Sequence, residues 1–495
     1  MENAFRWIIS LGTSDSSSIR PPLSVTMDLN KNRLYVYGQL PRRQKEMDLQ
    51  GLCKLGLHEC YGVDYDEIRI GQSTDGGLGC CSKPSLRSFQ LCERMDYELS
   101  QIKEAGLEGD FLLAWDIVNW AREQGIAVSP GARAAPSSLV SYLLRITDVC
   151  PIRFGLLFER LLTDKPTFFV ELCMHRGKEV LDYAKSKYGQ RCTIRQESAT
   201  PSEIHEMRGV EYLKPCTLVI SDVLTDHEAP SPKGSVKSDL PRVAPGAEYG
   251  KSLEIGMRGL NALTVIQDAV RRIRRRAAYR RFDIERISLD DPATFKYICD
   301  NSTTAIFQLG VGGMDEHCRE CRVHSVEDIA ALIAMCGVFA GKFIPQYLGG
   351  RKRAERIRAE HPLLADMCKE TSGILLYQEQ LMLALQAIAG FSLIEANTLR
   401  IDFGKKTKST MEVHREAFIK GAQRVKYLPK QEAHELFGLL YESVVYTSSK
   451  SHALAYAVTS YRTAYLKAHF YSEYMWAIVN SASGMAFVQE ESSVR

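Results

Sequence analysis

The sequence predicts an α+β fold, and three observations lead to that prediction. Two short β-like runs lie on either side of residues 30–32, near the start of the chain. Phe168–Cys173 is a mostly apolar run of the length that is typical of a buried strand. Most of the segment 287–485 has the apolar spacing of amphipathic helices, and one such face contains Leu375, Met382, Leu385 and Ala389. We therefore expect strands in the first half of the chain and mainly helices in the second.

Length and composition indicate an ordinary globular protein. The chain has 495 residues, which is enough for roughly two to four domains. Its net charge of +3 is too small to indicate nucleic-acid binding unless basic residues are clustered locally. The fourteen cysteines follow no secretory signal and are expected to be reduced thiols in a cytoplasmic protein. The longest apolar run, 329–341, is too short for a membrane span of about 20 residues, so no membrane partner is expected.

The segment 110–189 has the most informative pattern. A helical apolar period is expected to end at Gly125, with a strand beginning at 126–128. Pro130 and Gly131 predict a turn, and 136–138 can begin the next helix. A strand, a glycine-containing turn and a helix in this order can present backbone N–H groups to a phosphate.

The same segment resembles a known family. Residues 129–147 resemble the family sequence GPGRGSAAGSLVAYLLGIT, and residues 150–162 resemble DPIRYGLLFERFL. Both sequences belong to the palm of the bacterial replicative DNA polymerase III alpha subunit, a C-family polymerase. The resemblance implies a palm-like mixed sheet followed by a large, mainly helical fingers domain. It also implies DNA-directed DNA polymerase (nucleotidyltransferase) activity in DNA replication, with Mg2+ as cofactor and primer-template DNA and replisome proteins as partners.

The resemblance also predicts how the chain is divided. Residues 1–92 form an N-terminal segment without the family's PHP domain, and 93–266 correspond to the palm, with the thumb deleted and a linker at 230–246. Residues 267–485 correspond to the fingers, and 486–495 form a tail. The family's C-terminal DNA-binding modules would then be absent.

The metal-binding positions of the family are altered. Its aspartates hold two Mg2+ ions, and the resemblance places them on Thr167, Phe169 and Gly256, none of which can bind a metal through a carboxylate. Glu171 and Glu254 are the acids that remain nearby. We therefore expect no confident catalytic residue, no normal Mg2+ binding and impaired catalysis.

The turn that binds the incoming triphosphate in the family also differs. Its arginine and serine correspond to Ala132 and Ala134, while Arg133 is shifted by one position. A shift of one residue would turn the arginine side chain in another direction, unless the alignment itself is displaced by one residue.

The fingers resemblance suggests further nucleotide- or DNA-binding positions, in addition to Arg133. They are the polar or cationic residues Arg400, Lys405, Lys406, Lys450, His452 and Lys467. Residues 378–380 match the family's YQEQ and are interpreted as structural hydrogen-bonding groups.

Two further motifs leave alternatives open. Residues 267–281 contain seven arginines and predict a helix with a basic face, which either meets DNA phosphates or is a solvated surface. His317, Cys318, Cys321 and His324 have ligand types that suit zinc, but one Cys-x-x-Cys among fourteen cysteines is insufficient evidence, and no metal is predicted.

Three hypotheses about function follow. The chain is a catalytically impaired polymerase III alpha homologue that binds DNA or a replisome partner. Alternatively, it is an active or conditionally active DNA polymerase that uses Glu171 and Glu254. The third is that it is a gene remnant without function.

Overall fold

The computed structural model describes eleven stretches of the chain. They are residues 24–28, 33–37, 45–73, 86–162, 168–196, 213–221, 252–310, 313–336, 341–352, 361–405 and 408–480. The linker predicted at 230–246, the tail at 486–495, and Thr167 and Lys406 lie outside these stretches.

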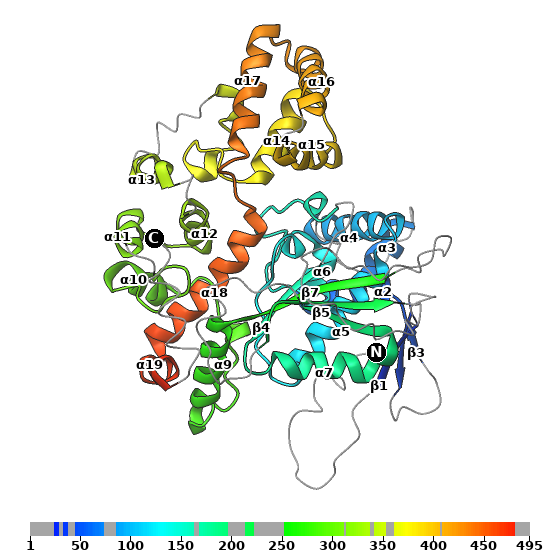
Figure 1. Ribbon diagram of the computed structural model, residues 1–495, viewed down its shortest axis with the longest axis vertical. Coiled ribbons are helices and arrows are strands. Elements are labelled where there is room, and N and C mark those ends of the chain that lie inside the picture. The colour runs from blue at the N-terminus through cyan, green and yellow to red at the C-terminus, as the bar shows by residue number, and fades with distance from the viewer. Residues whose placement is uncertain are drawn as a thin grey trace, which may run out of the picture.

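A four-stranded mixed sheet forms the centre of the first half, as Figure 1 shows. Its strands lie in the order β4-β7-β6-β5, with β4 and β7 parallel and the other neighbours antiparallel. Their bounds are β4 Phe168–Cys173, β5 Cys192–Gln196, β6 Cys216–Ser221 and β7 Ser252–Leu260. The β-like runs near the start form a separate antiparallel sheet of β1 Ser24–Asp28, β2 Arg33–Tyr37 and β3 Lys45–Met47.

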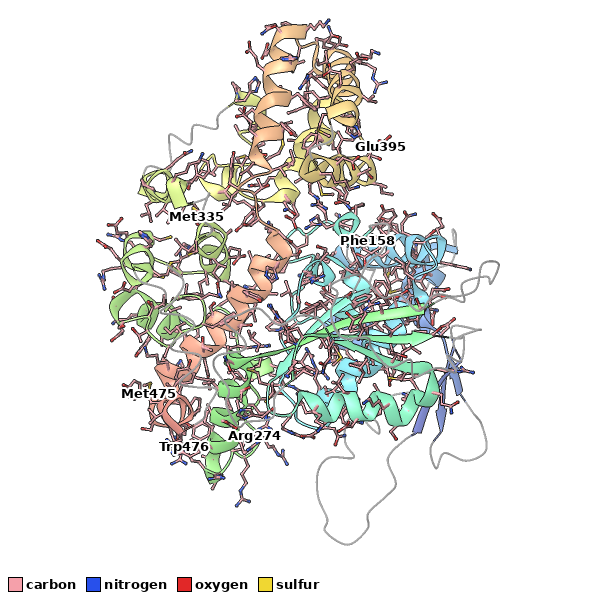
Figure 2. All side chains as sticks on the ribbon, viewed as in Figure 1. Phe158, Arg274, Met335, Glu395, Met475 and Trp476 are labelled. Carbon is pink, nitrogen blue, oxygen red and sulfur yellow. The ribbon has the colours of Figure 1, made fainter. Side chains whose placement is uncertain are left out.

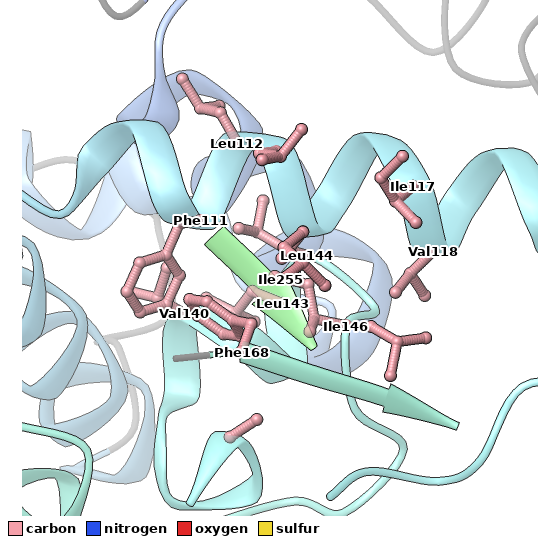
Figure 3. Packing of buried hydrophobic residues seen from close by; sticks show 14 of the residues in the cluster. Phe111, Leu112, Ile117, Val118, Val140, Leu143, Leu144, Ile146, Phe168 and Ile255 are labelled. Carbon is pink, nitrogen blue, oxygen red and sulfur yellow. The ribbon is translucent and has the colours of Figure 1, made fainter. Parts of the chain in front are cut away.

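Helices surround the central sheet and supply most of its core. Phe111 of α5 meets Phe168 of β4 edge to face, with ring centroids 4.9 Å apart, and Ile255 of β7 lies in the same apolar cluster (Figure 3). The helices of this half are α2 Leu49–Tyr61, α3 Tyr65–Ser73, α4 Leu86–Glu104, α5 Glu108–Glu123, α6 Leu139–Leu143, α7 Gly177–Tyr188 and α9 Asn261–Ile273.

Two predicted elements differ from the structure. Residues 126–128 form no strand, and only Val128 makes an isolated bridge to Leu172. The contact ends after Ser129 N–H donates to the Glu171 carbonyl, because Gly131, the next residue that would face β4, has a φ of 150°, outside the range of a strand. The arginine-rich helix ends at Ile273 instead of continuing to 281.

The second half is helical, which confirms the predicted fold class. Leu375, Met382, Leu385 and Ala389 are buried as expected. The helices are α10 Pro292–Asp300, α11 Met314–Cys321, α12 Val326–Met335, α13 Ile344–Lys352, α14 Gln378–Ala389, α15 Leu393–Lys405, α16 Lys408–Lys426, α17 Lys430–Ser443, α18 Lys450–His469 and α19 Tyr471–Asn480.

Short 3-10 turns connect these elements. They are η1 Ala135–Ser137, η2 Phe158–Arg160, η3 Gly189–Arg191, η4 Ala277–Tyr279, η5 Ile284–Arg286, η6 Gly341–Phe343, η7 Pro362–Leu364 and η8 Lys369–Thr371.

Helix α18 connects the two halves. It runs from the α14–α17 group, past α12, to α19 and α9 (Figure 1). Fifteen of its twenty residues are buried, so it packs on nearly all sides. Among the described helices, none combines the length and the apolar character needed to cross a membrane.

Candidate functional site

The outer face of β4 and β7 brings together the positions where the family aspartates were expected. Phe168, Val170 and Leu172 are buried in the sheet core, so the alternation of a strand turns Phe169 and Glu171 to the other face. The register pairs Phe169 with Gly256 and Glu171 with Arg258. Two of the three expected positions are therefore direct neighbours.

The Phe169 ring occupies the space beside Gly256. A Cβ atom built on Gly256 would lie 2.4 Å from Cδ2 of Phe169, which is far closer than any real carbon–carbon contact. Glycine is therefore required at 256 while Phe169 keeps its position. An aspartate at 256 would collide with the ring.

Glu171 is buried and already neutralised. It is 1 % exposed, and its Oε1 accepts hydrogen bonds from Arg258 Nη2 at 2.5 Å, Arg258 Nε at 3.1 Å and Tyr456 Oη at 2.8 Å. Arg258 Nη2 also donates to Tyr456 Oη at 2.6 Å. Burial opposes the charge on Arg258, but Tyr456 and Glu171 outweigh it and raise the arginine pKa. Burial, and then the Glu171 carboxylate, raise the pKa of Tyr456, so the phenol stays protonated and donates.

Arg133 lies over the Phe169 ring beside this group. Its guanidinium carbon is 4.4 Å from the Phe169 ring centroid, and that of Arg258 is 5.6 Å away, so both cations lie against one ring. The backbone of Arg133 has a left-handed φ of 53°. Its N–H donates to His452 Nδ1 at 3.4 Å, and its carbonyl accepts from Ser451 Oγ at 2.9 Å. Burial lowers the pKa of His452, which favours the neutral imidazole that accepts this bond.

We call Arg133, Phe169, Glu171, Arg258 and Tyr456 the palm cluster. It contains two guanidinium groups and one carboxylate. Glu171 Oε2 is also buried, with no hydrogen-bond partner within the described residues.

The remaining acid lies far from the palm cluster. Glu254 comes just before Ile255, which pairs with Phe168, and lies four residues from Arg258 along β7. At a rise of about 3.3 Å per residue, Glu171 and Glu254 are separated by about 13 Å along the strands. Glu254 is also paired with Arg195 at 3.2 Å.

No group of three or more His, Cys, Asp or Glu side chains that could hold a metal occurs in the described part of the chain. The chemistry of the palm cluster also does not fit a pair of Mg2+ ions, which need several oxygen ligands that carry negative charge. At the Cys-x-x-Cys segment, Cys318 and Cys321 are buried in the apolar core, whereas the His324 side chain is 72 % exposed.

The predicted fingers residues fall into separate environments. Arg400 donates to Asn397 Oδ1 at 2.9 Å and to Gln378 Oε1 at 3.3 Å, and burial, followed by repulsion from Arg160, lowers its pKa to about 10. Lys450 is paired with Glu370 at 2.9 Å.

The two other described lysines differ in exposure. Lys467 is buried and donates to the carbonyls of Ser302 and Thr304 at 2.9 and 2.6 Å, and burial lowers its pKa to about 8. Lys467 is therefore a structural group. Lys405 is exposed and paired with Asp402 at 3.1 Å.

The start of α18 links the two groups of residues. Its Lys450 N–H donates to Glu379 at 2.9 Å, and the neighbouring Ser451 hydroxyl bonds Arg133 in the palm. Glu379 also lies 3.8 Å from Arg160, a residue that the sequence analysis did not single out. Arg160 donates to Gln378 Oε1 at 2.8 Å, so Gln378 binds both Arg160 and Arg400.

Sequence reasoning also missed Arg258 and Tyr456. Arg258 could have been found, because it lies two residues after Gly256 and so on the same strand face. Tyr456 had no such signal, since its place depends on how α18 crosses the sheet.

Comparison with known proteins gives two domain matches. Residues 49–206 match the model of the bacterial DNA polymerase III alpha NTPase domain, and residues 262–426 match that of the bacterial DNA polymerase III alpha subunit finger domain. The chain is 31% identical to the DNA polymerase III subunit alpha of Thermus aquaticus over 79% of its length, and 29% identical to that of Treponema pallidum over 92%. It spans less than half of these relatives, 38% and 43% of their lengths.

Proposed function

This chain is a homologue of the bacterial DNA polymerase III alpha subunit, and we propose that it takes part in DNA replication without catalysing nucleotide addition itself. On this proposal it binds DNA or replisome proteins in the cytoplasm. Its proposed division is a palm at 93–266 and fingers at 267–485, after an N-terminal segment.

One observation carries the proposal, namely the pairing of Phe169 with Gly256. The two residues replace expected aspartates and fit one another, because the ring fills the volume that any side chain at 256 would need. A metal-binding carboxylate cannot be accommodated there without moving the ring.

The charges of the palm cluster support the same conclusion. Two Mg2+ ions about 3.5–4 Å apart would stabilise the attacking and leaving oxygens of nucleotidyl transfer. Here Arg133 and Arg258 flank the position, and the one carboxylate, Glu171, is bound by Arg258. The two guanidinium groups would repel Mg2+ ions, so the palm cluster offers no metal site for nucleotidyl transfer.

The alternative of a rebuilt polymerase site finds less support. It requires Glu171 and Glu254 to hold the same pair of ions, but they are separated by about 13 Å along the strands and paired with different arginines.

A gene remnant without function is also disfavoured. Random loss of aspartates would leave unpaired buried charges and voids, which are strongly destabilising. In the palm cluster, Arg258 and Tyr456 both donate to Oε1 of Glu171, although its Oε2 has no partner among the described residues, and the glycine matches the phenylalanine.

Primer extension by the purified chain tests the proposal. The reaction contains a primer-template, all four nucleotides and Mg2+ or Mn2+, and a Glu171→Gln variant is the matched control. We expect no extension by either protein. Extension by the natural chain that Glu171→Gln abolishes would reveal a working metal site and contradict the proposal.

A further inference from the structure

The C-terminal end of α9 and the turn after it concentrate positive charge. Residues 271–286 contain eight arginines, no lysine and two acidic residues, a net charge of +6. The whole chain has a net charge of only +3, so the rest of it is net acidic. Every residue from 274 to 281 is exposed. We call the surface of residues 271–281 the arginine surface.

A structural role accounts for only some of these arginines. Arg271 is 3.7 Å from Asp268, Arg276 is 3.0 Å from Glu473, and Arg274 donates to the Phe282 carbonyl at 2.8 Å. Cations in the last turn of α9 also interact favourably with the helix dipole, but that effect falls off within a turn.

Three arginines remain without such a role. Arg275, Arg280 and Arg281 lie beyond the end of α9 and are exposed, and their side chains make no ion pair or hydrogen bond within the described stretches. Eight like charges in sixteen residues repel one another, so their clustering costs stability unless an anion binds them.

Aromatic rings lie among the arginines. The Arg272 guanidinium is 4.4 Å from the Trp476 ring centroid, and that of Arg276 is 5.0 Å from Tyr279. Trp476 is 39 % exposed and Tyr279 is 37 % exposed, so both rings can be reached from solvent. Figure 2 shows Arg274 and Trp476 near one another, where α9 and α19 lie side by side.

We infer that the arginine surface binds single-stranded DNA. Guanidinium groups suit the phosphate backbone, because their planar donors can bind two oxygens at once. Accessible aromatic rings among them allow bases to stack, which is the combination found in sites for single strands. An acidic protein would use the charges but would gain little from the rings.

The surface is independent of the palm cluster. The inference takes DNA as the ligand from the proposed function, but its residues lie at the end of α9, in the turn after it and on α19, outside the β4–β7 face. Primer extension tests the palm, whereas a binding measurement tests these arginines, so either proposal can fail alone.

Fluorescence anisotropy with a labelled oligo-dT of about twenty nucleotides tests the inference over a series of salt concentrations. The variant is Arg275→Gln, Arg280→Gln and Arg281→Gln combined. The matched control removes the same charge from α16, at the other end of the molecule, with Lys420→Gln, Arg424→Gln and Lys426→Gln combined.

We expect the arginine variant to lose affinity about tenfold or more, and the salt slope to fall by about 2, since each lost phosphate contact on a single strand contributes about 0.7. The control should stay within about twofold of the natural chain. Equal losses in both variants, or no loss in either, would overturn the inference.

A Trp476→Leu variant distinguishes single-stranded DNA from duplex DNA and from an acidic polypeptide as the ligand. Stacking predicts that it weakens oligo-dT binding by about fivefold or more while binding to duplex DNA changes less. Tighter binding of duplex DNA or of poly-glutamate than of oligo-dT, with no effect of Trp476→Leu, would contradict a single-strand site.

Discussion

The palm cluster and the contacts around Gln380 in α14 differ in whether the polar side chains that the family resemblance predicts are present. Around Gln380, the side-chain oxygen accepts from the N–H groups of Leu376 and Tyr377 at 2.8 Å each, and its amide donates to Thr371 at 2.8 Å. At the palm cluster, a ring and a glycine occupy the two positions where the family resemblance predicts carboxylates. On the proposed function, the polar groups that hold the fold are present, whereas the groups that would hold metals are replaced.

That difference indicates that the polar groups needed for folding are distinct from those needed to bind metals. Buried hydrogen-bonding groups are expensive to lose, so a chain that must fold retains them. Metal ligands repel one another when no metal is bound, so their replacement by an apolar pair and an ion pair can leave the fold stable.

The largest effect is expected at Asp148, which links α5 to α18, the helix that connects the two halves. It binds Arg122 of α5 at 2.7 Å and Arg462 of α18 at 2.8 Å, and all three are largely buried. Asp148→Asn leaves both guanidinium groups without their carboxylate and should lower the free energy of unfolding by about 3–5 kcal/mol in urea denaturation. Arg153→Gln, which removes an exposed ion pair with Asp290, is the control and should change it by less than about 1 kcal/mol.

The ion pairs of Asp148 also predict how the stability of the chain falls at low pH. Burial alone would raise its pKa, but Arg122 and Arg462 lower it to about 2. The stabilisation is therefore complete above the unfolded pKa of about 4 and is lost as the pH falls toward 2. Unfolding monitored from pH 5 to 2 should show a steeper loss for the natural chain than for Asp148→Asn. Parallel curves would contradict this role.

The next effect concerns Gln380. Gln380→Leu removes the acceptor of two buried N–H groups and should destabilise the chain by about 2 kcal/mol or more. Gln386→Leu, at an exposed position of the same helix, should change stability by less than about 0.5 kcal/mol. Equal effects of the two substitutions would show that the hydrogen bonds are unimportant.

A smaller effect tests the fit inside the palm cluster. Gly256→Ala should cost about 1–3 kcal/mol because its Cβ meets the Phe169 ring. In a Phe169→Ala background the same substitution should cost close to nothing, and a double-mutant cycle measures the difference. Additive costs would mean that the two positions are not coupled.

The smallest effect is expected at Lys405, on the exposed side of α15. Lys405→Gln breaks an exposed ion pair with Asp402 and should lower the free energy of unfolding by less than about 0.5 kcal/mol. The midpoint of thermal unfolding should therefore change very little. A larger loss would mean that the surface of α15 contributes to stability.

The sequence predicted the elements that depend on local patterns. The apolar run of β4 and the helical spacing of Met382, Leu385 and Ala389 in α14 both appear as expected, whereas Leu375 lies before that helix. The family resemblance pointed to Phe169 and Gly256 as positions of one site, and the strand register makes them direct neighbours, a pairing that the sequence analysis did not predict. Local patterns and the resemblance therefore predicted the fold class and the region of the candidate site, whereas the loss of the aspartates stays a prediction.

The features that the sequence analysis could not predict depend on contacts between residues that lie far apart in the chain. Tyr456 reaches Glu171 across 285 positions, through a helix whose crossing over the sheet no local pattern reveals. The end of α9 was placed too late because arginine is a good helix former, so propensity alone does not stop the helix at Ile273.

Binding of Mn2+ to the purified chain tests the central claim most directly, since the electron paramagnetic resonance signal of free Mn2+ falls as the ion is bound. The account predicts no site tighter than about millimolar that depends on Glu171, so the natural chain and Glu171→Gln should give the same titration. Binding of two Mn2+ ions at micromolar concentration that is lost in Glu171→Gln would contradict it.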